Sequence, residues 1–396
     1  MSIRIYYTDA ACTDFDATVT EVTSLNGRPA VALDTTAFYP LSGGQPCDAG
    51  TLGEALVVDV VESDGGEVWH VLDREIAVGS RVHGTIDRAR RFDHMQQHTG
   101  QHILSAAFDR LSQARTVGFH LGAVVSTLDL AIDLPAEAIA AAEAEANRVV
   151  WEDRPVGVRF VSDTEAAALP LRKEPGRGGT LRVIDVEGYD MSACGGTHVS
   201  RTGSIGVIAV LSAERLRGGV RVEFVCGGRA LRCLRTFRDA VAGCIRHVSV
   251  APEELPAALE RLQAENKEQR KAARDLQERL AGYEAAALAS GAEEVSGVRQ
   301  VIQALDGRDQ NTLKSMALAI CGAPGFQVAL FTTSPPYNAV LARSKDGTTD
   351  CAAALKALLA AFGGRGGGKP ELALGGGLNG DLAQILSAAR AGLGRV

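Results

Sequence analysis

The alternation of apolar and polar positions predicts β-structure from residue 1 to about residue 92. Short runs with a period of two, such as residues 57–61 and Val68–Leu72, are typical of half-buried strands. Turn-forming sequences separate them: Asn26-Gly27, Asp64-Gly65-Gly66 and Gly84. We therefore expect a small β-barrel at the N-terminal end.

The pattern becomes helical from residue 91 to residue 111, where apolar residues return every three or four positions. Strand-like sequence follows at 117–134, an Ala/Glu-rich helix is expected at 135–152, and further strands are expected between 181 and 225. These features indicate an α+β domain, and the whole chain is expected to be an α+β multidomain protein.

Residues 251–290 show a different periodicity, with a strict alternation of four- and three-residue steps. The positions on this seam are Leu255, Leu259, Leu262, Asn266, Gln269, Ala273, Leu276, Leu280 and Tyr283. The pattern favours a coiled coil of about four heptads, in which Asn266 would fix the register. The alternative is one amphipathic helix that packs against its own domain. A glycine-rich α/β segment follows from residue 295.

Four domains are expected from these patterns. They comprise a barrel at 1–92, an α+β core at 93–245, a helical coiled-coil linker at 250–292 and a C-terminal domain at 293–396.

Composition narrows the class of protein. The 396 residues carry a net charge of −7, so nucleic acid contact would need local basic patches. Residues 1–20 lack the apolar core of a signal peptide, and no segment is long and apolar enough to span a membrane. We expect a cytoplasmic protein, in which a Cys near a His indicates metal binding before a disulfide.

Two short motifs have the spacing of metal ligands. His94, His98 and His102 lie four residues apart on the predicted helix, so only one adjacent pair can chelate an ion, the outer two being about 12 Å apart. A second motif, Cys194-Gly195-Gly196-Thr197-His198, places a thiol and an imidazole on a tight turn. Two residues from each motif would make a tetrahedral zinc site, and spacing leaves open which histidine pair takes part.

These motifs resemble a known family. HMQQHTGQHILSAAF and SACGGTHV are similar to the motifs of the AlaX family, relatives of the alanyl-tRNA synthetase editing domain. The segments at 36–45 (TAFYPLSGGQ), 118–122 and 221–227 also fit. Gly363–Pro370 and Gly375–Gly377 resemble the DHHA-type domain that closes alanyl-tRNA synthetases. The resemblance is to the long form of AlaX, without room for an ATP-dependent aminoacylation domain.

The resemblance implies an activity and a set of residues. It implies a trans-editing hydrolase that deacylates tRNA for alanine mischarged with Ser or Gly, without ATP. Zinc would be held by His98, His102, Cys194 and His198, and would position the substrate. Thr36 would recognise the serine hydroxyl and Gln45 would orient water or the ribose. The expected substrate contacts are Phe38, Tyr39, Gly43, Gly44, His120 and Arg221.

The expected partners are tRNA and a second copy of the chain, bound through the coiled coil and the C-terminal domain. The candidate RNA-binding residues are Arg88, Arg90, Arg91, Arg172, Lys173, Arg177, Arg215, Arg217, Arg221, Arg365 and Lys369. Gly363–Lys369 imitates a phosphate-binding loop, but Pro370 replaces the magnesium-binding hydroxyl and a helix precedes the loop, so an NTPase is excluded.

Two other functions remain as alternatives. The chain could be a non-catalytic zinc-containing module for tRNA binding or dimerisation. It could also be a DHH-type phosphoesterase, although Asp93-His94-Met95 is its nearest approach to the required Asp-His-His motif.

Overall fold

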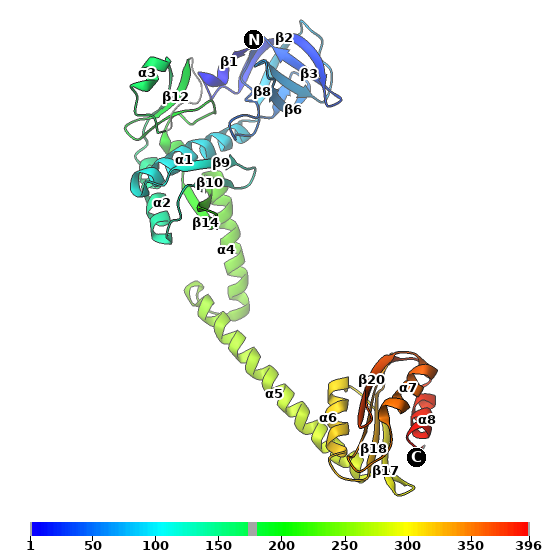
Figure 1. The fold of residues 1–396 in the computed structure, drawn as a ribbon. Helices are drawn as coiled ribbons and strands as arrows, with labels where there is room; N and C mark the ends of the chain where they lie inside the picture. Colours follow the sequence, from blue (N-terminus) through cyan, green and yellow to red (C-terminus); the bar gives the residue numbers. More distant parts are fainter. Residues whose placement is uncertain (1, 173–179, 395–396) are drawn as a thin grey trace. The chain divides into compact units, whose positions relative to one another are not determined.

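The computed structural model describes residues 2–172 and 180–394 (Figure 1). The chain forms two compact units, Met1–Arg246 and His247–Val396. Each is described by itself. None of the helices in the described part combines the length and the hydropathy that crossing a bilayer requires.

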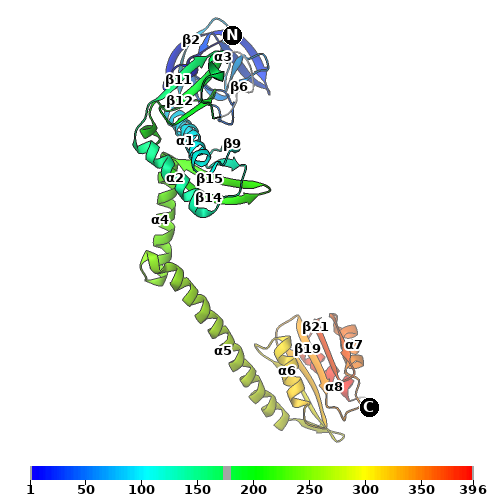
Figure 2. The same ribbon diagram turned by 60° about the vertical axis from the view of Figure 1, so that its left-hand side comes forward.

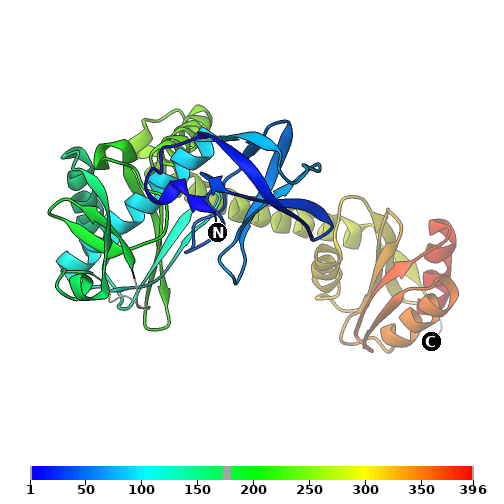
Figure 3. The ribbon, with the colours of Figure 1, turned by 90° about the horizontal axis from the view of Figure 1, so that it is seen from above.

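The first unit begins with a closed six-stranded barrel, shown in blue in Figure 3. Its strands, in barrel order, are β2 (Asp14–Leu25), β3 (Arg28–Leu33), β7 (Val68–Leu72), β6 (Ala55–Glu62), β5 (Gly50–Leu52) and β8 (Arg81–Ile86). Beside it, β1 (Ile3–Arg4) pairs with β4 (Thr35–Thr36). In the first half of β2, buried residues alternate with more exposed ones, as is typical of a strand with one face in a core. The predicted barrel is therefore confirmed.

A long helix, α1 (Arg88–Ser112), follows the barrel. Asp87 caps its first turn by accepting from the Arg90 N–H, and Gln113 ends it in the left-handed conformation. It packs against α2 (Ala136–Trp151) and a four-stranded sheet (Figure 2). That sheet has the order β14 (Ile208–Leu216), β15 (Gly219–Cys226), β10 (Ser126–Leu130), β9 (Thr116–Leu121). Because α1 is covered on most sides, its polar residues are buried as well as its apolar ones.

A three-stranded sheet completes the first unit. It consists of β11 (Val156–Val161), β12 (Leu181–Val186) and β13 (Asp190–Ala193), with the short helix α3 (Asp163–Ala167) between β11 and β12. The last helix is α4 (Gly228–Val248). The sequence patterns had assigned neither β11 nor α4. In α4, exposed apolar residues such as Leu231, Leu234 and Val241 recur at helical spacing, a signal that could have revealed it.

The second unit is an α/β domain preceded by α5 (Leu255–Ser290). Its sheet has the order β16 (Glu293–Val295), β17 (Val298–Leu305), β18 (Phe326–Thr332), β19 (Tyr337–Arg343), β21 (Leu372–Leu378), β20 (Arg365–Lys369). α6 (Gln310–Ile320) and the end of α5 cover one face, whereas α7 (Cys351–Phe362) and α8 (Leu382–Leu393) cover the other. The glycine-rich segment is an edge strand that follows helix α7, so it is not a phosphate-binding loop.

Helix α5 uses a narrow alanine face to pack on its own domain. Ala281 and Ala285 are buried in the core between α5, α6 and the sheet. The seam residues are not on this face: Leu276 is 62% exposed and Tyr283 is 70% exposed. The packed-helix alternative therefore accounts for one face of α5 and leaves the leucine seam uncovered.

Candidate metal centre

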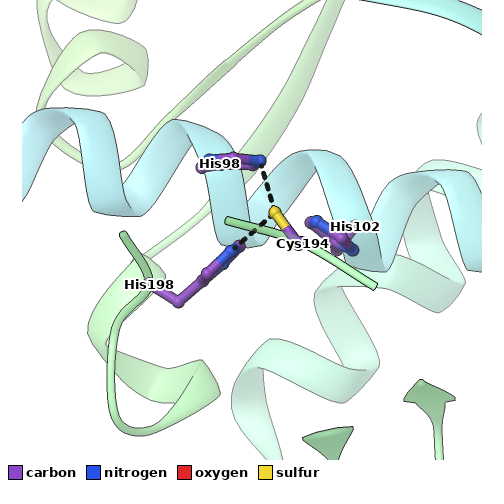
Figure 4. Close-up of side chains that lie close together, drawn as sticks. All are labelled: His98, His102, Cys194 and His198. Carbon is purple, nitrogen blue, oxygen red and sulfur yellow. Dashed lines mark hydrogen bonds between the residues drawn. The ribbon is translucent and has the colours of Figure 1, made fainter. Parts of the chain in front are cut away.

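Four potential ligands converge beside the middle of α1 (Figure 4). His98 and His102 come from consecutive turns of α1, Cys194 directly follows β13, and His198 lies in the loop beyond it. Their ligand atoms all lie within 4.8 Å of one another. His94 is not in the cluster, so of the two histidine pairs that spacing left open, the structure selects His98 and His102.

The distances fit a tetrahedral ion. The Sγ of Cys194 is 3.4 Å from Nε2 of His98 and 3.4 Å from Nε2 of His198. In a tetrahedral zinc site the Zn–S and Zn–N bond lengths place these atoms about 3.6 Å apart. The cluster therefore has the donor set and nearly the dimensions of a Cys–His₃ site.

A further side chain orients each imidazole through its Nδ1 atom. The pairs are His98 with Gln45 Oε1 at 2.8 Å, His198 with Thr99 Oγ1 at 3.2 Å, and His102 with Asp190 Oδ2 at 3.4 Å. An Nδ1–H that donates to such a partner leaves Nε2 as the metal-binding atom. All three rings thus present the same nitrogen toward the thiol.

The loop that carries Cys194 is held tightly against α1. Arg182 donates to the carbonyl oxygens of Cys194 and Gly196, at 2.7 and 2.9 Å. A Cβ atom on Gly196 would lie 2.1 Å from Cε1 of His98, so only glycine allows the ring this close. Gln45 completes the junction, because it donates to the Thr197 hydroxyl and accepts from the Thr197 N–H.

The electrostatics favour a thiolate at Cys194. Burial by itself would raise the pKa of the thiol, but the imidazoles of His98 and His198 and the hydrogen bonds outweigh it, so the pKa is held well below its ordinary value. Burial lowers the pKa of His198 to about 3, and this imidazole is therefore neutral. Burial also opposes protonation of His102, but Asp190 and Cys194 raise its pKa to about 9. A thiolate and neutral imidazoles are the forms that bind zinc, so His102 would release its extra proton when the metal binds.

Thr36 is fully buried on β4, beside the barrel, and its hydroxyl has two partners. Oγ1 accepts from the Phe38 N–H at 3.1 Å and is 2.8 Å from Nε2 of His70. The Nδ1 atom of His70 is 3.1 Å from the Val31 carbonyl, which only accepts, and burial lowers the pKa of His70 to about 4. The ring is therefore neutral with its proton on Nδ1, so Thr36 donates to Nε2. One acceptor position of the hydroxyl remains.

The neighbouring residues expected to contact substrate have structural partners. Phe38 packs edge-on against Phe15 in the barrel core, and the Tyr39 hydroxyl donates to the Ser42 carbonyl. Gly43 and Gly44 form a turn with positive φ angles of 54° and 77°. Gly44 lies against β9, because its carbonyl accepts from Leu121 and its Cα faces Phe119. The substrate-contact roles of these residues stay predictions.

The remaining predicted residues lie on surfaces. His120 is exposed on β9, and the guanidinium of Arg221 is bound by both carboxylate oxygens of Asp129 at 2.7 and 2.8 Å. Arg91 does not belong with the RNA-binding candidates: it is 1% exposed and is paired with the buried Asp48. Lys173 and Arg177 lie outside the described residues.

Sequence reasoning missed residues that support the metal ligands and the partner of Thr36. His70, Asp190 and Arg182 stand in ordinary strand sequence, and nothing in their spacing connects them with the histidine helix. Thr99 was the one visible signal, because it lies between His98 and His102 in the motif.

Comparisons with known proteins show similarity in the segment that carries two of the four potential ligands. The family model "Threonyl and Alanyl tRNA synthetase second additional domain" matches residues 181–223, a segment that contains Cys194 and His198. This segment is thus similar to a domain of that description.

The relatives are more specific. The chain is 35% identical to the alanine–tRNA ligase of Methanoculleus marisnigri over 393 residues, 94% of this chain and 41% of that one. Against the enzyme of Natronomonas pharaonis it is 35% identical over 420 residues, covering 98% of this chain and 43% of that one. The C-Ala domain from Aquifex aeolicus alanyl-tRNA synthetase matches 26% of this chain and 97% of that one, at 18% identity and a TM-score of 0.25. The chain is thus homologous to alanine–tRNA ligases along nearly its whole length and spans about two-fifths of theirs.

Proposed function

We propose that this protein hydrolyses the aminoacyl ester of tRNA for alanine that carries serine, or glycine, by mistake. The observation that supports this most is the His98, His102, Cys194 and His198 cluster, with an oriented nitrogen on each imidazole, in a chain homologous to alanine–tRNA ligases. A synthetase pocket discriminates weakly against a near-isostere with one extra hydroxyl, and a second hydrolytic site is the general remedy.

The proposed metal is one zinc ion per chain. Because four protein ligands fill a tetrahedral shell, its charge would serve to attract and orient the substrate rather than to generate the nucleophile. The protein groups around it would bring water and the ester carbonyl together in a fixed geometry.

Gln45 is proposed to act mainly by holding the ligand set. Its Oε1 already accepts from His98 and from Thr197, and its Nε2 donates to Thr197. One N–H of the amide has no partner among the described residues, and it is the group that would contact water or the ribose. This joins the predicted catalytic role of Gln45 to a positioning role that the sequence had not suggested.

Thr36 is proposed to discriminate serine from alanine. Since its proton is used by His70, the free lone pair of Oγ1 would accept a hydrogen bond from the serine hydroxyl. Correct alanyl-tRNA would leave that acceptor unpaired, a cost that favours hydrolysis of the wrong ester.

The direct test is deacylation of Ser-, Gly- and Ala-charged tRNA for alanine added to the purified full chain with zinc. We expect Ser-tRNA to be hydrolysed well above the uncatalysed rate and Ala-tRNA to be spared. Intact esters in all three reactions, with zinc bound, would favour the alternative of a non-catalytic tRNA-binding module.

A further inference from the structure

A pocket separate from the metal cluster lies beside α1, one helical turn before the metal ligands. It has a volume of about 290 Å³. The lining residues that matter here are Pro46, Arg90, Asp93, His94, Arg229 and Arg232. None of these residues belongs to the metal cluster, and the proposed reaction does not use them.

The pocket carries an excess of positive charge. Three guanidinium groups line it against one carboxylate, that of Asp93. Arg229 takes up this carboxylate, with Nε 3.0 Å from each of its oxygens, and donates Nη1 to the Gly122 carbonyl. Arg229 is therefore neutralised and fixed. Arg232 shares the same carboxylate only at 3.7 Å, so the pocket keeps an excess of two positive charges.

Arg90 and Arg232 have guanidinium nitrogens available for a ligand. The Nε of Arg90 donates to the Cys47 carbonyl at 3.0 Å, which fixes its side chain, and its two terminal nitrogens have no partner among the described residues. The side chain of Arg232 is 67% exposed and approaches Asp93 only to 3.7 Å. Two guanidinium groups with free donors make a site for an anion such as a phosphate.

His94 supplies a buried polar group in the same wall. It is 4% exposed, and its Nδ1 is buried without a hydrogen-bond partner in the described part of the chain. Burial, with help from Arg90, lowers its pKa to about 4, so the imidazole is neutral. Its single proton belongs on Nε2, because a proton on the enclosed Nδ1 would lack an acceptor. The ring thus has one N–H donor left for a ligand.

The position of the pocket suggests which anion it takes. Pro46 directly follows Gln45, which binds the metal ligand His98, and His94 precedes His98 by one helical turn, about 6 Å along the axis. In the proposed substrate, the ribose that carries the ester is joined through its 5′ oxygen to a phosphate only a few bonds away. An ester at the metal cluster would therefore bring this phosphate within reach of the pocket.

We propose that Arg90, His94 and Arg232 bind the phosphate that links the last two nucleotides of the charged tRNA. This inference rests on the proposed function, and it deepens it by assigning the contact that orients the acylated ribose.

The experiment compares two substrates. One is serylated tRNA for alanine, and the other is the same molecule with an uncharged methylphosphonate in place of the last linking phosphate. The variants are Arg232→Gln and Arg90→Gln, with Arg235→Gln, an exposed arginine of α4 that does not line the pocket, as the matched control. We expect either pocket variant to lower kcat/KM about 5- to 20-fold on the natural substrate and to cause no further loss on the neutral one. Equal losses on both substrates, or no loss on either, would overturn the proposal.

Failure of the proposed function is distinguishable from failure of the pocket. If the wild-type chain hydrolyses none of the esters, binding of a CCA trinucleotide without an attached amino acid is measured by fluorescence anisotropy. Arg232→Gln should then bind the trinucleotide more weakly than wild type and Arg235→Gln do. If this difference disappears when the linking phosphate is replaced by the neutral methylphosphonate, the result supports the phosphate site without the hydrolase. Identical binding by all three proteins would overturn the phosphate site.

Discussion

Each histidine of the cluster depends on a second side chain for its orientation. Gln45 comes from the loop between β4 and β5, Thr99 from α1 itself and Asp190 from β13, so three separate segments must be in place before the nitrogens converge. Such partners commonly change metal affinity 10- to 100-fold when they are removed. Single substitutions can therefore distinguish residues that bind the metal from residues that only orient a ligand.

We expect the wild-type chain to bind one zinc ion, measured by elemental analysis. Cys194→Ala and His102→Ala should lose the metal, Gln45→Leu should weaken its binding by about 10- to 100-fold, and His94→Ala should retain it. Full zinc content in Cys194→Ala would refute this site.

The Thr36→Val variant should lose selectivity. Valine keeps the shape and removes the acceptor, so kcat/KM on Ser-tRNA should fall about 5- to 150-fold, while hydrolysis of Ala-tRNA should not fall. Thr36→Ser retains the hydroxyl and is the matched control, with zinc content and circular dichroism as checks on folding. If valine slows both substrates equally, Thr36 positions the ester generally and does not discriminate.

His70 should make the first unit sensitive to acid. Its pKa is about 4 in the folded protein, where burial excludes the charge, against 6.5 in an unfolded chain. The unfolded state therefore binds more protons below pH 6.5, and stability is lost as the pH falls from 6.5 toward 4, by about 3 kcal/mol in the limit. Urea unfolding followed by tryptophan fluorescence reports on this unit, since Trp69 and Trp151 both belong to it. His70→Asn should flatten the pH dependence relative to His120→Asn. An unchanged slope would show that other groups cause it.

Among the elements, α5 resembles α4 in leaving apolar side chains exposed. Its alanine face packs on the C-terminal domain, but Leu262 and Leu276 on the seam are 44% and 62% exposed. Leucines repeated at coiled-coil spacing gain most by meeting the same seam on another helix.

We expect the full chain to be a dimer by light scattering, and the double variant Leu262→Glu, Leu276→Glu to be a monomer. Charges at core positions of a coiled coil remain desolvated and unpaired, so association should be lost without unfolding α5's own domain. Leu318→Glu, at an exposed position of α6, is the control and should remain dimeric. A monomeric wild type would leave the single packed helix as the better account.

At the scale of the whole molecule, the proposed sites are distributed between the two units. The metal cluster and the arginine pocket lie entirely in Met1–Arg246, and the leucine seam and the glycine-rich edge strand lie in His247–Val396. Each unit has its own hydrophobic core, so the first should fold when the second is removed.

Deletion of residues 251–396 should leave zinc binding intact and weaken tRNA binding. The shortened chain keeps every proposed ligand but loses the seam, Arg365 and Lys369. A rise in the tRNA dissociation constant, with a monomeric mass, is the expected result. An unchanged dissociation constant together with an unchanged mass would contradict both roles assigned to the C-terminal part.

The sequence by itself determined the local features of this protein. Periodicity sufficed for strands β6 and β7 of the barrel, for α1 and for α5, because burial of one face repeats at two or at about 3.6 residues. Residue spacing also sufficed to identify candidate metal ligands, since residues four positions apart on a helix share a face. It left two histidine pairs open, because both have the same geometry on an isolated helix.

Only the tertiary structure determined the contacts between residues that are far apart in the sequence. His94 lies outside the cluster, and the Thr36 hydroxyl donates its proton to His70. Gln45 bonds to His98, and Arg91 is buried in an ion pair with Asp48. The tertiary structure also formed the arginine pocket from α1, α4 and the turns at Pro46 and Ala123. The physical reason is common to all of these: a hydrogen bond or an ion pair between residues far apart in the chain leaves no periodic trace in the sequence.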